Sequence, residues 1–439
     1  MSELLLLGTS HKTAPIAMRE RIALPERRAD AFLRELAAHP EIREAVILST
    51  CNRTELYVVV SDPVEAETTV LGMLARQAGL RPTELIDGIY SHRNCDAARH
   101  LYRVTSGLES MIVGEAEVQG QVKRAYEAAL AARTAGPLIN KLFRAALATG
   151  KRVRSETSIG AGGASVASVA VEAARTALGE LASRHVLIIG AGETAELTAR
   201  ALHDHGVTTM FIANRRRDRA IALAQQFGGA SGSFDALPSE LARADIVISS
   251  TSSPHALLGA EELATVVDQR GGRPLLLIDL AVPRDIDPDC AELPGVTVVD
   301  IDGLQAQVRS HISVRKVEAR RAEGIVEEEI QAFAGWLGTL EVMPTVTALR
   351  AHADDIVTQV LAENEGRWDT LSERDRKRVE ALARAIAKRL LHEPTARVKG
   401  LEATRRHARL QLLRELFGLD EAAPEAAEQP AEVRELRRR

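Results

Sequence analysis

The stretch HVLIIGAGETAELTARAL, residues 185–202, decides the fold of the central part of the chain. An apolar run typical of a buried strand leads into G-x-G-x-x-A, and an amphipathic helical segment follows. Gly190 permits the tight turn, Gly192 lets the backbone approach a pyrophosphate, and Ala195 allows close packing of helix on strand. We expect this turn to bind a dinucleotide, and the alternative is a Rossmann-like domain that binds nothing. The predicted cofactor-binding residues are Gly190, Ala191, Gly192, Glu193, Thr194 and Ala195.

The sequence around this motif alternates apolar runs with helical segments. TTMFIANR, ADIVISSTS and PLLLIDLAVP are typical of further buried strands, and helical patterns lie between them. Such alternation indicates a doubly wound parallel sheet. We therefore predict a Rossmann-type domain over residues 156–302, which begins at a glycine-rich loop.

The end of the second predicted strand favours one form of the cofactor. Enzymes that use NAD usually carry an acid there, which holds the ribose 2′-hydroxyl. Here the strand ends in Asn214, and Arg215, Arg216 and Arg217 follow without an acid. Cations suit a 2′-phosphate, so the sequence favours NADPH, with Asn214 and Arg215 as contacts. The alternative is a solvated arginine run that opens the next helix.

The flanking regions differ from this central one. Residues 1–155 mix strand-like runs with amphipathic helices and predict an α+β domain. Residues 303–420 are helical throughout: a long, charged segment with a sparse apolar stripe suits an exposed spacer helix, and further amphipathic helices follow after Pro344. Their apolar stripes need a partner, which is each other or a second subunit. Residues 421–439 are polar and are expected to be a disordered tail.

The composition restricts the class of protein. The chain has 439 residues, a formal net charge of −5 and only 3% aromatic residues, so it carries no global basic signature of a nucleic-acid binder. Three cysteines make no disulfide framework, which fits a reducing compartment. The leucine run near the N-terminus lacks a basic flank and is too short for a membrane span. We expect a soluble cytoplasmic protein without membrane association.

One of these cysteines stands between two strand-like runs, in AVILSTCNRTELYVVV, residues 45–60. Arg53 follows Cys51 by two residues, and a nearby cation lowers a thiol pKa and favours the nucleophilic thiolate. The alternative is a small buried hydrophobe, the commoner state of a free cysteine. Cys95 and Cys290 have no comparable surroundings. His92, Cys95 and His100 lack a fourth ligand, so we expect no metal site.

A further polar run, GEAEVQGQ at residues 114–121, follows Ser110. It is either the first turn of a helix, with acids near the positive end of its dipole, or a polar wall for an amino-acid head group. A dinucleotide domain beside an activated cysteine suggests one chemistry. A thiolate forms an acyl-enzyme, and the reduced cofactor converts the thioester to an aldehyde.

The sequence resembles the glutamyl-tRNA reductase family. The resemblance is carried by GTSHKTAPIAMRERIAL, LSTCNRTELY, HLYRVTSGLESMIVGEAEVQGQVK, VLIIGAGETAELTARAL, ANRRRDRA and IDLAVPRDIDP, which cover most of residues 1–300 in the family's order. The C-terminal third matches more loosely, as a helical dimerisation domain. The resemblance implies NADPH-dependent reduction of glutamyl-tRNA to glutamate-1-semialdehyde, the first step of tetrapyrrole biosynthesis, and a homodimer.

The resemblance also implies a role for particular residues. Cys51 is the nucleophile that forms a glutamyl thioester, and His100 is an acid/base or orienting group. Arg53 is the natural partner of a substrate carboxylate. The substrate-binding positions are Thr50, Cys51, Asn52, Arg53, Ser110, Glu115, Ala116, Glu117 and Gln121.

The tRNA partner needs a local basic surface, and a complex with the next enzyme, the semialdehyde aminomutase, is expected because the aldehyde is reactive. Lys141, Arg144, Lys151 and Arg152 fall on one arc of a predicted helix, either as a phosphate contact or as a solvated face. Two rivals remain: an NADP dehydrogenase of a free small molecule, of the shikimate dehydrogenase kind, and a non-enzymatic nucleotide sensor with a helical dimer arm.

Overall fold

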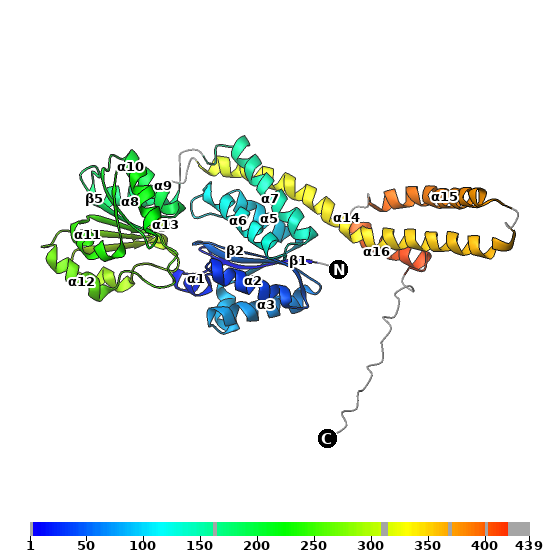
Figure 1. The fold of residues 1–439 in the computed structure, drawn as a ribbon, viewed down its shortest axis with the longest axis horizontal. Helices are drawn as coiled ribbons and strands as arrows, with labels where there is room; N and C mark the ends of the chain where they lie inside the picture. Colours follow the sequence, from blue (N-terminus) through cyan, green and yellow to red (C-terminus); the bar gives the residue numbers. More distant parts are fainter. Residues whose placement is uncertain (1–2, 161–164, 309–314, 368–370, 400–402, 420–439) are drawn as a thin grey trace, which may run out of the picture. The chain divides into compact units, whose positions relative to one another are not determined.

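The computed structural model describes residues 3–160, 165–308, 315–367, 371–399 and 403–419. The chain divides into two compact units, Met1–Gln331 and Ala332–Arg439. Figure 1 shows the elements in order along the chain. No helix among these described residues is long and apolar enough to cross a membrane. The predicted disordered tail, residues 421–439, lies outside the described residues.

The N-terminal part of the first unit is built on a four-stranded antiparallel sheet in the order β2-β3-β1-β4. Helices α1, α2 and α3 cover one face of this sheet, and α5, α6 and α7 cover the other (Figure 1). Every residue of β3 is buried, because this strand is sandwiched between helices and paired on both edges. The predicted α+β class is thereby confirmed. The elements are β1 (Glu3–Ser10), α1 (Ile16–Ile22), α2 (Glu26–Ala38), β2 (Ile42–Ser49), β3 (Arg53–Val60), α3 (Pro63–Ala78), α4 (Pro82–Leu85), β4 (Tyr90–Arg93), α5 (Asn94–Thr105), α6 (Glu117–Ala131) and α7 (Pro137–Glu156).

A six-stranded parallel sheet follows, in the order β10-β9-β8-β5-β6-β7. Strand β5 is buried on both faces: Val186 and Ile188 belong to one apolar cluster, and Leu187 and Ile189 belong to another. This is the doubly wound fold that residues 185–202 predict. The strands are β5 (His185–Ile189), β6 (Thr209–Ala213), β7 (Ala230–Gly232), β8 (Ile246–Ser249), β9 (Leu275–Asp279) and β10 (Val296–Asp300), and the helices are α8 (Val166–Leu178), α9 (Glu193–Asp204), α10 (Arg217–Phe227), α11 (Leu237–Arg243), α12 (Ala260–Gln269) and α13 (Ile301–Val308).

Helix α14 (Arg315–Glu363) differs from the prediction in two respects. It runs through Pro344, where the sequence predicts a break, because a long helix tolerates one missing backbone hydrogen bond when side chains around it are buried, as Val342 and Val346 are. Its N-terminal part is also less exposed than a spacer would be. Ile325 and Ile330 are buried there, within the first unit.

The second unit contains the rest of α14 with α15 (Glu373–Lys399) and α16 (Ala403–Leu416). Its buried apolar cluster is small and joins Val342, Val346 and Leu410. Large apolar side chains stay exposed on these helices: Ile356, Val360, Leu382, Ile386, Leu390, Leu412 and Leu416. Within the described part of the chain, much of the apolar surface of these helices is therefore not covered by other residues.

Candidate active site

Cys51 lies in the tight turn that joins β2 to β3, and its side chain is partly exposed. The amide of Thr50 donates to the carbonyl oxygen of Arg53 at 2.8 Å, which closes the hairpin. The amide of Asn52 donates to Oγ1 of Thr50 at 3.2 Å. The two strand-like runs around the cysteine therefore form an antiparallel hairpin that displays it at one end of the sheet.

Two neighbouring segments hold this turn by its carbonyl groups. The amide of His11 donates to the carbonyl oxygen of Asn52 at 2.9 Å. Arg19, on α1, is 3% exposed and donates from Nη1 to the carbonyl oxygen of Cys51 at 2.8 Å. The backbone that carries the thiol is therefore fixed by a buried cation, which sequence reasoning missed.

The electrostatic surroundings of the thiol differ from the expectation. Burial, followed by the carboxylates of Glu115 and Glu117, raises the pKa of the Cys51 thiol to about 12, and Arg19 is the cation that lowers this pKa. Arg53 is engaged elsewhere, so the predicted activation of Cys51 by Arg53 is wrong. The Cys51 thiol is therefore protonated at neutral pH, and the predicted nucleophilic role requires that this proton leave first.

Arg53 is instead part of a buried network centred on Glu55, which is fully buried on β3. The carboxylate of Glu55 accepts hydrogen bonds from Arg53 Nη1 at 2.7 Å, the Tyr57 hydroxyl at 2.7 Å, the Tyr90 hydroxyl at 2.6 Å and His100 Nε2 at 2.8 Å. Burial opposes ionisation, but His100, Arg53 and these hydrogen bonds outweigh it and hold the pKa of Glu55 well below its usual range. Two predicted site residues, Arg53 and His100, thus share one anion.

The sequence contains one signal for this network. Glu55 is a charged residue within the otherwise apolar strand TELYVVV. Opposite it on β1 stands Gly8, and a Cβ there would lie 2.8 Å from Cγ of Glu55. A carboxylate in a buried strand needs hydrogen-bond partners, and the glycine beside it on the next strand leaves room for its side chain. Together they indicate a buried polar network.

The loop from Gly107 to Ala116 packs over this network. Arg53 donates from Nη2 to the carbonyl oxygen of Glu109, and Arg103 donates to the Glu109 carboxylate at 2.7 Å. Gly114 has φ +91°, and a Cβ there would lie 1.9 Å from the carbonyl oxygen of Ile159, so only glycine fits. The loop is therefore fixed both by the guanidinium and by its own tight packing.

This loop brings two acids beside the thiol. Glu115 is 5% exposed; burial and Glu117 raise its pKa to about 7, although Arg53 and a hydrogen bond with Ser110 lower it. Burial and Glu193 raise the pKa of Glu117 to about 7 as well. Both carboxyl groups therefore change charge near neutral pH, next to a thiol that needs to lose a proton.

The remaining predicted substrate residues lie on the same loop and helix. Helix α6 begins at Glu117 with Ala116 as its N-cap, so the run GEAEVQGQ does open a helix as one alternative stated. Gln121 lies one turn further along α6, and it is half-buried. Within the described part of the chain, no hydrogen bond or ion pair joins Ala116 or Gln121 to the turn of residues 50–53 (the thiol turn).

The glycine motif forms the junction of β5 and α9. Gly190 has φ +116°, and a Cβ there would lie 2.7 Å from the carbonyl oxygen of Ser250, so the fold itself requires this glycine. A Cβ on Gly192 would meet open space, so packing does not require this second glycine. Ala195 is fully buried. The open space over Gly192, at the N-terminus of α9, fits a pyrophosphate.

The three arginines that follow β6 have different surroundings. Arg216 pairs with Asp218 at 3.1 Å, and Arg217 opens α10. Asn214 donates from Nδ2 to the carbonyl oxygen of Arg216 at 3.1 Å, which shapes the turn. Arg215 is exposed at the carboxyl edge of the sheet, and within the described part of the chain it forms no ion pair.

The thiol turn and the dinucleotide fold meet within the first unit. Cys51 packs against an apolar cluster that joins Ile16, Met111 and Ile112 of the N-terminal part to Ala195 and other residues of the parallel-sheet part. Around this contact Arg19 forms an ion pair with Asp302, and Arg284 binds both carboxylate oxygens of Glu20 at 2.8 and 2.9 Å. One apolar cluster and two ion pairs therefore connect the part of the chain that carries Cys51 to the part that carries the glycine motif.

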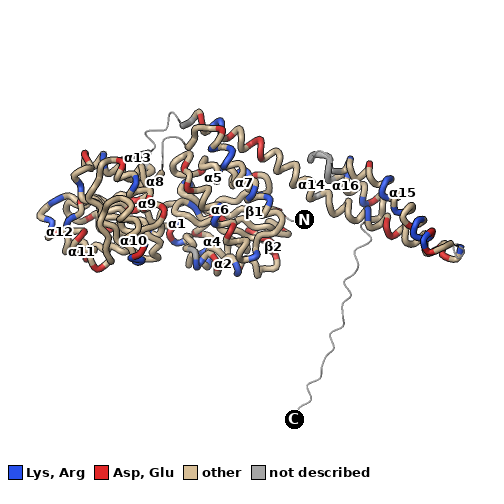
Figure 2. The backbone as a smooth tube through the Cα atoms, turned by 45° about the horizontal axis from the view of Figure 1, so that its top comes forward, with Lys and Arg blue, Asp and Glu red and all other residues tan. Residues whose placement is uncertain are grey.

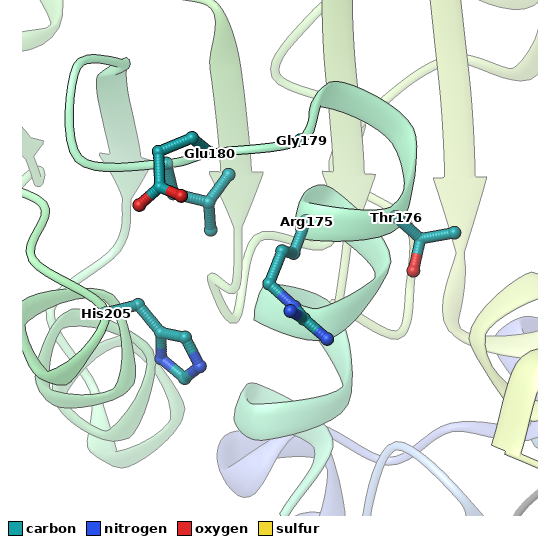
Figure 3. Close-up of a pocket in the computed structure, with 6 residues that line it drawn as sticks. Arg175, Thr176, Gly179, Glu180 and His205 are labelled. Carbon is teal, nitrogen blue, oxygen red and sulfur yellow. The ribbon is translucent and has the colours of Figure 1, made fainter.

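A surface pocket of about 370 Å³ lies elsewhere on the parallel-sheet domain (Figure 3). Arg175, Glu180 and His205 line it, and they lie where α8 and α9 end and the chain enters β5 and β6. This is the amino edge of the sheet, whereas nucleotides bind at the carboxyl edge. The pocket is therefore not the dinucleotide site.

The structure also describes the surroundings of Arg152, His92 and His100. Arg152 belongs to the basic arc that is either a phosphate contact or a solvated face. It binds Glu156, Glu328 and Glu329 at 2.8 to 3.1 Å, so this arginine is engaged by α7 and α14. The rings of His92 and His100 lie 5.3 Å apart. Among the residues that the structure describes, no group of three or more His, Cys, Asp or Glu side chains is placed to hold a metal ion.

The acidic surroundings of the thiol lead to a prediction. Glu115→Gln removes a negative charge that is present above pH 7, so the pKa of Cys51 falls and its alkylation by iodoacetamide at pH 8 accelerates roughly 3- to 10-fold. Mass spectrometry of the Cys51 peptide measures the rate. Glu127→Gln, on the exposed part of α6, is the matched control and leaves it unchanged. An unchanged or slower rate in Glu115→Gln contradicts this electrostatic account.

Comparison with protein families identifies three consecutive matches along the chain. The N-terminal domain of glutamyl-tRNA(Glu) reductase matches residues 7–157, shikimate/quinate 5-dehydrogenase matches residues 172–307, and the dimerisation domain of glutamyl-tRNA(Glu) reductase matches residues 321–419. The order of these matches follows the order of the two sheets and the C-terminal helices.

Individual proteins agree over nearly the whole length. Glutamyl-tRNA reductase of Pelotomaculum thermopropionicum is 40% identical over 429 residues, which cover 98% of this chain and 97% of that protein. The enzyme of Rubrobacter xylanophilus is 44% identical over 392 residues, with 89% and 91% covered. The solved structure of glutamyl-tRNA reductase from Methanopyrus kandleri is 32% identical, with a TM-score of 0.53, and covers 95% of this chain and 99% of that one. The resemblance inferred from the sequence is confirmed: the chain belongs to the glutamyl-tRNA reductase family.

Proposed function

We propose that this protein reduces glutamyl-tRNA to glutamate-1-semialdehyde with NADPH, the first step of tetrapyrrole biosynthesis. The observation that carries the proposal is the Cys51 turn, which is held by buried polar contacts and packs against an apolar cluster shared by the N-terminal part and the dinucleotide fold. A thiol suited to acyl transfer and a fold suited to a nicotinamide cofactor belong to one compact unit.

The proposed reaction has two chemical steps. The Cys51 thiol loses its proton, and its sulfur attacks the ester carbonyl carbon of glutamyl-tRNA. A C–S bond forms, the C–O bond to the tRNA ribose breaks, and the ribose oxygen takes up a proton as the tRNA leaves. When bound, NADPH supplies the hydride that reduces the thioester carbonyl. The C–S bond then breaks, the aldehyde is released and the thiolate regains a proton. We assign the proton transfers to His100.

The glutamyl head group would occupy the space between the thiol turn and the loop from Gly107 to Ala116. Arg53 supplies a buried positive charge at the floor of this space. The same charge lowers the pKa of Glu115, so the two groups interact electrostatically. Acids near the thiol suit the ammonium group of an aminoacyl ester. The proposed binding set is Thr50, Cys51, Asn52, Arg53, Ser110, Glu115, Ala116, Glu117 and Gln121.

NADPH would bind at the carboxyl edge of the parallel sheet. Residues 190–195 would hold the pyrophosphate at the N-terminus of α9, and Asn214 with Arg215 would contact the ribose 2′-phosphate. The open space over Gly192 and the exposed guanidinium at the end of β6 support this placement.

We propose the domain division that the sequence indicates: residues 1–155 for catalysis, 156–302 for the cofactor and 303–420 for a spacer helix and dimerisation. The exposed apolar residues of α14, α15 and α16 are suited to a homodimer contact. Helix α15 carries nine Lys and Arg residues against four acids, and Figure 2 shows them interspersed along it, so it is a candidate surface for tRNA phosphates. A cytoplasmic location and a complex with the aminomutase complete the proposal.

The main rival function accounts for less of the chain. A dehydrogenase of a free small molecule would use the region matched by shikimate/quinate 5-dehydrogenase, residues 172–307. It would leave the thiol turn, the Glu55 network and the C-terminal helices without a role. We therefore favour the reductase.

The central prediction concerns Cys51→Ser. Removal of the thiolate should lower the reduction of glutamyl-tRNA by more than about 100-fold, because a serine hydroxyl is a far weaker nucleophile. Wild type should form semialdehyde only with NADPH and hydrolyse the ester slowly without it, and the variant should lose both activities. Cys95→Ser is the control and keeps both. Full reductase activity in Cys51→Ser rules out the mechanism, and equal use of free glutamate rules out the tRNA substrate.

A second prediction tests the form of the cofactor. Arg215→Glu should raise KM for NADPH by roughly 10- to 100-fold and change KM for NADH much less, because the lost charge faces only the 2′-phosphate. Arg216→Glu is the matched control, since Arg216 already pairs with Asp218. Equal losses with both cofactors would remove the argument for 2′-phosphate recognition at this position.

A further inference from the structure

The inference concerns the fully buried carboxylate of Glu55. Three donors reach its Oε1 atom: Arg53 Nη1 at 2.7 Å, the Tyr90 hydroxyl at 2.6 Å and His100 Nε2 at 2.8 Å. The Tyr57 hydroxyl reaches Oε2 at 2.7 Å. Next to a guanidinium and with this many donors, the group is an ionised carboxylate, which has lone pairs and no hydrogen to give.

These four accepted hydrogen bonds determine which ring nitrogen of His100 carries a hydrogen. Because the carboxylate only accepts, the hydrogen between Nε2 and Oε1 belongs to the imidazole. In a neutral imidazole one nitrogen carries a hydrogen and the other holds a free lone pair. With Nε2 protonated, Nδ1 is the nitrogen that is able to take a proton.

We propose that Glu55 is a positioning residue for His100: it fixes the Nε2–H tautomer and the ring orientation, and so makes Nδ1 the proton-accepting atom of the site. The proposal rests on the proposed function, in which His100 moves the proton of the thiol or of the departing ribose oxygen. It assigns to Glu55 the role that a buried carboxylate has beside the histidine of hydrolytic triads.

The surroundings of the ring support a fixed orientation. Tyr90 lies with its ring centroid 5.1 Å from that of His100, and its hydroxyl binds the same carboxylate. His92 lies 5.3 Å from His100 and 5.6 Å from Tyr90. Strand β4 therefore restrains the imidazole through ring contacts, while Glu55 restrains it through Nε2.

The carboxylate itself is fixed more firmly than a surface acid would be. Glu55 is the third residue of β3, and pairing with Gly8 of β1 and Leu48 of β2 holds its backbone on both sides. Gly8 on β1 leaves just enough room for its side chain, since a Cβ would come within 2.8 Å of Cγ. Arg53 links the opposite end of the network to the carbonyl oxygen of Glu109.

The test uses the full-length protein and Glu55→Gln, which keeps the shape of the side chain and removes its charge. We expect kcat for glutamyl-tRNA reduction to fall by roughly 10²- to 10⁴-fold, with KM for glutamyl-tRNA within about threefold of wild type. Solid-state NMR of ¹⁵N-histidine-labelled protein should show Nε2–H for His100 in wild type and a changed tautomer population in the variant. The His100 signal is assigned by its loss in His100→Asn.

Tyr57→Phe is the matched control, because it removes one donor from the same carboxylate without touching His100. It should retain the Nε2–H tautomer and keep kcat within about tenfold of wild type. A merely structural role of the network predicts similar losses in Glu55→Gln and Tyr57→Phe and an unchanged tautomer in both.

Different outcomes overturn different claims. A neutral His100 in wild type that carries its hydrogen on Nδ1 instead of Nε2 overturns the inference, and this measurement needs no variant to fold. A folded Glu55→Gln with normal kcat also overturns it. An Nε2–H signal in a wild-type protein that makes no semialdehyde from glutamyl-tRNA supports the positioning of His100 and contradicts the proposed function instead.

Discussion

The rest of the site depends on one ionised carboxylate that the fold keeps away from water. Arg53, His100 and two tyrosine hydroxyls donate to Glu55 and together hold it in its charged form. Removal of one partner from a buried ion pair typically costs about 3–5 kcal/mol, so these groups act together. The same anion holds the guanidinium at the floor of the site and the imidazole at its side.

The Cys51 thiol, unlike the Glu55 carboxylate, lies in surroundings that favour its uncharged form. Burial and two acids keep Cys51 protonated, and the buried Arg19 anchors its carbonyl group while pairing with Asp302 of the dinucleotide fold. A protonated thiol reacts poorly with electrophiles. A substrate that neutralises Glu115 and Glu117 would also remove the negative charges that raise the pKa of the thiol. In this account reactivity depends on the bound substrate, and Arg19 links the nucleophile to the cofactor fold.

The sequence predicts the parts of this molecule that local patterns determine. The glycine motif with its flanking strand and helix predicts the parallel sheet, and the two apolar runs around Cys51 predict the hairpin. The partners of Glu55 could not be predicted, because Tyr90 and His100 are brought to it by sheet pairing and helix packing some 35 to 45 residues along the chain. For the same reason Arg53 was expected to activate the thiol, although it pairs with Glu55. The sequence also left open whether Arg152 contacts phosphate or is a solvated face, and acids on α14 bind it.

The most direct test of the account is to follow the acyl group itself. Protein mixed with glutamyl-tRNA that carries ¹⁴C-glutamate, without NADPH, is quenched in acid and digested, and the labelled peptide is identified. We predict label on Cys51, and its release as semialdehyde when NADPH is added to the unquenched complex. Label on another residue, or semialdehyde formed without prior label on Cys51, would contradict the central claim.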